Sequence, residues 1–86
     1  MDENELFKMI GYIMATEYRQ NIIRCHGNSM KTPSKIAKEV GLRTNHVSNV
    51  LKSLKDNKIV VCLNEDARKG RLYKNTELGL KILENI

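Results

Sequence analysis

The sequence predicts one small, mainly α-helical domain with a single β-hairpin, an α+β fold that spans residues 1–86. Two short helical patterns joined by a tight turn occupy residues 32–54, an arrangement typical of a helix-turn-helix. A β-branched run at 59–63, a polar loop and a return strand at 71–75 then predict the hairpin. Apolar residues at helical spacing before and after this unit predict three more helices.

The N-terminal part of the chain is expected to form two helices. Residues 4–14 repeat apolar side chains at three- and four-residue spacing, with Ile10 and Ile13 deepest in the stripe. A break follows, and the hydroxyl of Thr16 can cap a second helix. We expect this second helix to end by Gly27, because glycine readily leaves the helical conformation.

The helix-turn-helix pattern begins at Thr32, whose hydroxyl can cap a helix. Pro33 suits the first helical position, because its missing N–H would be unpaired there in any case. Gly41 can adopt the left-handed conformation that ends this helix, and Thr44 offers the N-cap of the next one. The apolar stripe of that next helix consists of Val47, Val50, Leu51 and Leu54.

The end of the chain predicts the hairpin and a last helix. Asn57 is the residue expected to turn the chain left-handed after the second motif helix. The strands at 59–63 and 71–75 enclose a polar loop. Thr76 can cap the last helix, in which Leu78 and Ile82 are spaced by four.

Positive charge is concentrated on the helix-turn-helix and the hairpin. Residues 31–74 contain eleven Lys and Arg against four acids, a net charge of +7, whereas the segments before and after each carry −1. Such segregation indicates a surface that binds a polyanion, and nucleic acid is the commonest partner of this kind.

The wet side of the second motif helix carries polar side chains, none of them acidic. Such a set on a recognition helix can read base edges in the major groove of DNA. A merely solvated helix face is the alternative interpretation. The candidate base-reading residues are Asn45, His46, Ser48, Asn49 and Lys52.

Three cations occupy the tip of the hairpin, where they would reach a phosphate backbone or the adjacent minor groove. The acids Glu65 and Asp66 in the same loop keep a solubilising loop tip as the alternative. The full set of predicted backbone contacts is Lys31, Ser34, Lys35, Arg43, Thr44, Arg68, Lys69 and Arg71.

These motifs resemble those of winged helix-turn-helix transcription regulators, of the small archaeal and bacterial type near the MarR-like and ArsR-like families. The runs that carry the resemblance are P-S-K-I-A-K-E-V-G-L, V-S-N-V-L-K-S-L-K-D-N-K-I-V and R-K-G-R-L-Y-K-N-T-E-L-G. It covers the chain from Thr16 to Ile86. It implies a short first strand at Met30 and Lys31, a recognition helix in the major groove, and a hairpin, the wing, along the DNA backbone. Many relatives carry an arginine where this chain has Asn49.

The terminal helices expose more apolar surface than one small core can cover, so we expect a homodimer. Its predicted contacts are Phe7, Ile10, Met14, Leu80 and Leu83. A two-fold dimer would place two recognition helices about 34–36 Å apart, one turn of DNA.

Other classes of protein fit the sequence less well. A winged helix used as a protein-interaction module would predict an acidic or apolar recognition face and a short neutral wing. RNA binding is disfavoured, because no stacking aromatics interleave the basic residues. No phosphate-binding loop or nucleophile elbow supports an enzyme.

Metal sites, cofactors and membrane insertion are not expected either. Cys25 and Cys62 stand far apart in the sequence, and the paired-cysteine motif of ArsR-like metal sensors is absent, so both fit small core residues. No apolar run approaches the roughly 20 residues that span a membrane. The acidic start M-D-E-N-E does not match a secretory signal, so we expect a cytoplasmic protein. The sequence identifies no small-molecule effector.

Overall fold

In the computed structural model, which describes residues 3–86, the apolar stripes fold into five helices and one antiparallel pair of strands. The order of elements is α1 (Glu3–Met14), α2 (Glu17–His26), α3 (Pro33–Val40), α4 (Thr44–Asp56), β1 (Val60–Cys62), β2 (Tyr73–Asn75) and α5 (Glu77–Glu84). All five predicted helices and both predicted strands are therefore present, and the fold class is confirmed.

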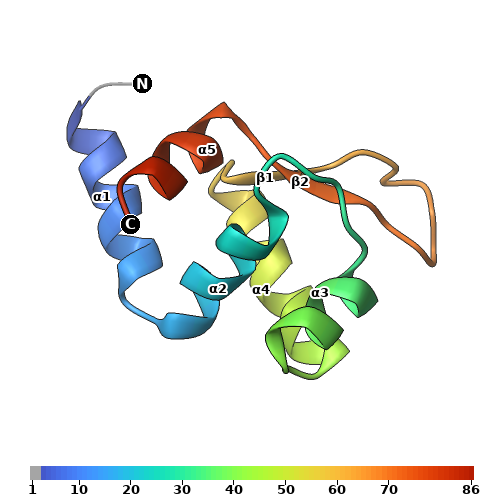
Figure 1. Ribbon diagram of the computed structural model, residues 1–86. Helices are drawn as coiled ribbons and strands as arrows, with labels where there is room; N and C mark the ends of the chain where they lie inside the picture. Colours follow the sequence, from blue (N-terminus) through green and yellow to red (C-terminus); the bar gives the residue numbers. More distant parts are fainter. Residues whose placement is uncertain (1–2) are drawn as a thin grey trace.

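The elements divide the molecule into three regions (Figure 1). Helices α1 and α5 lie together at one end, and α3 and α4 form the other end, with α2 between them. The hairpin loop projects to the side, beyond α3. None of the helices in residues 3–86 has both the length and the apolar character needed to cross a membrane.

A single hydrophobic core joins the helical stripes to the inner side of the hairpin. Ile13 is fully buried as expected, whereas Ile10 is only half-buried at the edge of the core. The fully buried apolar side chains with no exposed surface are Ile13, Ile22, Ile23, Ile36, Val47, Leu51, Leu54, Ile59 and Ile82. Because α3 and α4 contribute four of these, the core itself sets the angle between the two motif helices.

Several helix ends follow the local signals in the sequence. The Thr32 hydroxyl accepts a hydrogen bond from the Lys35 N–H at 3.2 Å, which caps α3. Gly41 ends the same helix in the left-handed conformation, with φ 74°. The Thr76 hydroxyl caps α5 by accepting from the Gly79 N–H at 3.2 Å, but the Thr16 side chain makes no such bond at the start of α2.

The prediction that Thr44 caps α4 is wrong. Arg43 holds the extended N-cap conformation, and its carbonyl accepts the first helical hydrogen bond, from the Val47 N–H at 3.1 Å. Thr44 is therefore the first helical residue.

The left-handed residue after α4 is Lys58, with φ 62°, and not Asn57 as predicted. The Ile59 N–H donates to the Leu54 carbonyl and the Lys58 N–H to the Lys55 carbonyl, both at 2.9 Å. This pair of bonds forms a Schellman ending, whose left-handed position falls one residue beyond Asn57.

The two strands are shorter than the predicted runs and pair in the register Val61↔Lys74. The expected short first strand is a single bridge, in which Lys31 and Tyr73 exchange both main-chain hydrogen bonds at 2.9 Å. Near the loop, the Asn64 side chain replaces a strand partner by accepting from the Leu72 N–H at 2.7 Å, which ends the ladder early.

Candidate nucleic-acid interface

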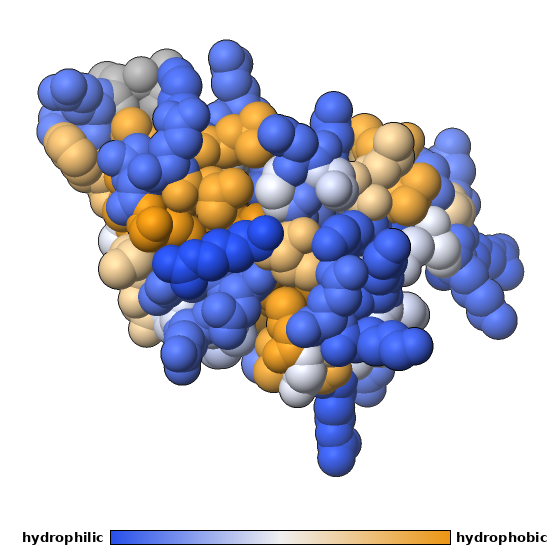
Figure 2. Space-filling view, in the orientation of Figure 1, coloured by the Kyte–Doolittle hydropathy of each residue, from blue (hydrophilic) through white to orange (hydrophobic). Residues whose placement is uncertain are grey.

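A groove of about 690 Å³ lies between the start of α3, the outer side of α4 and the wing, which we define as residues 60–75. Five cations and one acid, Asp56, line this basic groove. Its lining consists of Thr32, Pro33, Ser34, Thr44, Ser48, Asn49, Lys52, Lys55, Asp56, Arg68, Lys69, Gly70, Arg71 and Tyr73. Hydrophilic surface also covers α3 and the tip of the wing in Figure 2.

The groove brings together eight of the residues singled out from the sequence. Three come from the candidate base-reading set: Ser48, Asn49 and Lys52. Five come from the candidate backbone set: Ser34, Thr44, Arg68, Lys69 and Arg71. Residues as far apart in the sequence as Ser34 and Arg71 therefore share one concave surface.

Other candidates lie outside the lining of the groove. His46 is exposed on the opposite flank of α4, where its ring meets that of Tyr18 edge to face at 4.7 Å between centroids. Asn45, Lys35 and Arg43 are exposed but do not line the groove.

Lys31 is occupied by contacts within the chain. Its amine donates to Glu39 Oε2 and to the Cys25 carbonyl, each at 2.7 Å, and the Cys25 thiol also donates to Glu39 Oε2 at 2.7 Å. The hydrogen bonds from the Cys25 thiol and the Lys31 amine lower the pKa of Glu39, so this carboxylate stays ionised. We therefore leave Lys31 out of the proposed contacts with DNA.

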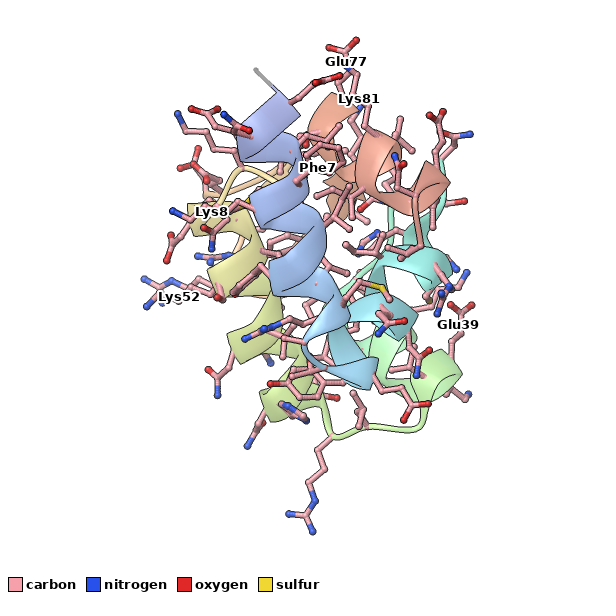
Figure 3. All side chains as sticks on the ribbon, turned by 90° about the vertical axis from the view of Figure 1, so that its left-hand side faces the viewer. Phe7, Lys8, Glu39, Lys52, Glu77 and Lys81 are labelled. Atoms are coloured by element: carbon pink, nitrogen blue, oxygen red, sulfur yellow. The ribbon has the colours of Figure 1, made fainter. Side chains whose placement is uncertain are left out.

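The same pairing keeps the one acid of α3 away from the groove. Figure 3 shows Lys52 and Glu39 on opposite sides of the molecule. The first turns of α3 and α4 also hold no acidic residue. The main-chain N–H groups in the first turn of α4, which no side chain caps, and the positive ends of both helix dipoles are thus available to anions such as phosphates.

Side-chain hydrogen bonds give the wing a defined shape. The Asn64 amide donates to the Gly70 carbonyl at 3.1 Å while its oxygen accepts from Leu72. The Arg71 Nε donates to the Ala67 carbonyl at 2.8 Å. The loop is therefore closed across its base, and the cations at its tip are carried by an ordered scaffold.

Sequence reasoning missed Lys55, which lines the groove one turn beyond Lys52. Lys55 follows Ser48 by seven residues, which places both side chains on the same helical face, and this spacing could have predicted Lys55 from the sequence. Lys55 forms an ion pair with Glu65 of the wing. The hydrogen bond between the two side chains raises the pKa of Lys55 and lowers that of Glu65. This pair links α4 directly to the wing. Tyr73 is a second missed residue, and its side chain forms part of the floor of the groove.

A contact from α1, supported by α2, holds α4 at a residue outside the groove lining. The hydroxyl groups of Tyr12 and Ser53 are hydrogen-bonded to each other. The Arg19 guanidinium lies over the Tyr12 ring at 3.9 Å and donates to the Tyr12 carbonyl at 2.8 Å. Because α4 is held at Ser53 in this way, it presents the groove residues from a fixed position.

The residues predicted for a dimer interface lie on α1 and α5. Phe7 and Met14 are 63% and 50% exposed, and Ile10, Leu80 and Leu83 are half-buried. Figure 3 shows Phe7 next to α5, and apolar surface spreads over the α1 and α5 region in Figure 2.

Comparisons by sequence find no relative: no family model matches the chain, and no curated protein matches it. Solved structures do match. A mutant of ZitR from Lactococcus lactis has a TM-score of 0.70 and 17% identity, over 95% of this chain and 70% of that one. The same mutant in its apo form has a TM-score of 0.71 and 20% identity, over 99% and 70%.

A mutant of MepR from S. aureus also matches, with a TM-score of 0.60 and 22% identity, over 99% of this chain and 73% of that one. ZitR and MepR are winged-helix transcription regulators of the MarR family. The likeness extends over nearly the whole chain, although few residues are identical. The chain therefore has the winged helix-turn-helix fold that the sequence resemblance implied, with α3 and α4 as the helix-turn-helix and residues 60–75 as the wing.

Proposed function

We propose that the protein binds double-stranded DNA and regulates transcription, with α4 in the major groove and the wing along the backbone. The observation that carries this proposal is the composition of the basic groove, where five cations stand against one acid between a fixed helix and an ordered wing. A B-DNA major groove is about 12 Å wide and admits one α-helix. Both proteins of similar structure, ZitR and MepR, are transcription regulators, which agrees with this assignment.

The contacts divide into two kinds. Ser48, Asn49 and Lys52 project from α4 toward base edges, where hydrogen bonds can read sequence. The wing cations and the N-termini of α3 and α4 bind phosphates, which fixes the register of the protein on the duplex. An acidic protein ligand would also find cations here, but it would not need the amide and hydroxyl groups that alternate with them.

The protein acts as a homodimer in this proposal, joined through α1 and α5. Phe7 and Met14 expose large apolar side chains on α1, and a second copy would cover them. The acidic terminal segments are thereby buried together, and the basic groove stays free. The two recognition helices would then read a near-palindromic site.

A titration that compares three nucleic acids tests the proposal. Fluorescence anisotropy is measured with random duplex, with a random single strand and with duplex from the region upstream of the protein's own gene. We expect the duplexes to bind more tightly than the single strand, and the upstream region most tightly. Equal affinity for all three, or preference for the single strand, would overturn the assignment.

A matched pair of variants separates the groove from general charge. Lys52→Ala and Lys81→Ala remove the same charge, but only Lys52 lines the groove, whereas Lys81 is exposed on α5. Lys52→Ala should weaken duplex binding clearly, and Lys81→Ala should leave it nearly unchanged. Equal losses would show that net charge, and not the groove, binds the duplex.

A further inference from the structure

We infer that Asn49 determines base specificity by reading an adenine in the major groove. This inference rests on the proposed function and goes beyond it by naming the base. Four residues of the first three turns of α4 line the basic groove: Thr44, Ser48, Asn49 and Lys52. Of these, only Asn49 has a planar side chain that offers a donor and an acceptor side by side.

The Asn49 carboxamide is free for a ligand. Several other asparagines use their side-chain amide for hydrogen bonds within the protein. Asn57, Asn64, Asn75 and Asn85 each donate to a main-chain carbonyl. The Asn49 side chain makes no hydrogen bond with any other residue of 3–86, and it is exposed where it lines the groove. Its hydrogen-bonding capacity is therefore uncommitted.

The position of Asn49 is also fixed. Val50 and Leu54, its neighbours on the inner face of α4, are buried in the core. The Tyr12–Ser53 hydrogen bond also ties α4 to α1 one turn beyond Asn49. A recognition side chain on a rigid helix discriminates better than one on a loop, because its geometry cannot adapt to the wrong base.

An asparagine carboxamide matches adenine in the major groove. Its Nδ2 donates to adenine N7 while its Oδ1 accepts from the adenine N6 amino group. Guanine presents two acceptors, O6 and N7, so the Oδ1 would face an acceptor without a proton between them. A good bidentate pair of this kind discriminates against the wrong base by about 5- to 150-fold.

The chemistry around Asn49 points to the same base. Guanine is read most often by arginine, and α4 carries no arginine. The ammonium of Lys52 is a point charge, which binds a phosphate as readily as it binds a guanine base. In the wing, Arg68 and Arg71 are suited to the narrow minor groove of A·T-rich DNA, which attracts arginine.

Selection from a pool of random duplexes tests the inference. The wild-type protein should enrich sequences with an adenine at one position of each half-site. Asn49→Ala should lose the preference at that position alone, whereas Asn21→Ala, which changes an exposed asparagine of α2, should keep it. Both variants are expected to fold, because alanine favours the helix.

Replacement of the selected adenine by 7-deazaadenine, which lacks the N7 acceptor, gives a second measurement. The substitution should weaken wild-type binding by about 5- to 150-fold and should not change binding by Asn49→Ala. A guanine at the selected position, an adenine preference that survives in Asn49→Ala, or wild-type binding that ignores the deaza substitution would each overturn the inference. If the protein did not bind double-stranded DNA, no duplex sequence would be enriched, and this result differs from each of the three outcomes above.

Discussion

Gly79 lies where α5 crosses the hairpin, and it leaves no space for a side chain. The Cβ that alanine would add lies 2.4 Å from the main-chain oxygen of Ile59. It also lies 3.1 Å from both Cβ and Oδ1 of Asn75. The Ile59 oxygen accepts hydrogen bonds from the N–H and the hydroxyl of Thr76, both at 3.0 Å, so it cannot move without weakening them.

We therefore expect Gly79→Ala to destabilise the protein. The helix α5 must shift by about 1 Å to restore an ordinary carbon–oxygen contact. The overpacking and the weakened hydrogen bonds together cost about 3 kcal/mol. The better helix propensity of alanine returns about 1 kcal/mol. The net loss is about 2 kcal/mol, a large fraction of the roughly 5–15 kcal/mol that stabilises a typical domain.

Urea denaturation followed by circular dichroism measures this change, at one protein concentration because self-association would alter the apparent stability. Gly11→Ala is the matched control, because Gly11 also lies within a helix but has no atom within 4 Å of the added Cβ. It should raise the free energy of unfolding by about 0.5–1 kcal/mol. A Gly79→Ala variant as stable as the wild type would refute the argument from close packing.

Three further predictions follow from the wing, the apolar face and a buried histidine. Lys69→Ala should weaken binding to every duplex and lower the slope of log affinity against log salt by about 1, and an unchanged slope would place this side chain in solvent. Phe7→Glu should give monomers in sedimentation velocity, and circular dichroism should show that they retain their helical content. A wild-type protein that sediments as a monomer at micromolar concentration would contradict the dimer. Burial lowers the pKa of His26 and outweighs the opposing effect of the Ser29 main chain. The unfolded chain therefore binds a proton that the folded chain does not, so the free energy of unfolding should fall as the pH drops below about 6.5. His26→Leu should reduce this fall in urea titrations, and an identical pH dependence would exclude His26 as its source.

The parts of the fold that follow from local chemistry could be predicted from the sequence. Thr32 caps α3 and Gly41 ends it, because an N-cap hydroxyl and a left-handed glycine act within a few residues. The end of α4 was misplaced, since the Schellman hydrogen bonds select Lys58 although an asparagine adopts the left-handed conformation more easily. The early end of the hairpin depends on Asn64, whose side chain reaches eight residues along the chain, and no periodicity signals such a contact.

The candidate site shows the same division between local and tertiary information. Helical spacing places both His46 and Asn49 on the wet side of α4, and the sequence cannot rank them, because the solvent-exposed arc of a helix is wide. The packing of α2 decides between them. Tyr18 occupies the flank of α4 beside His46, and the wing borders the flank beside Asn49. Of the two residues, Asn49 therefore lies in the concave surface that the cations of α4 and the wing share, and base reading is proposed for it.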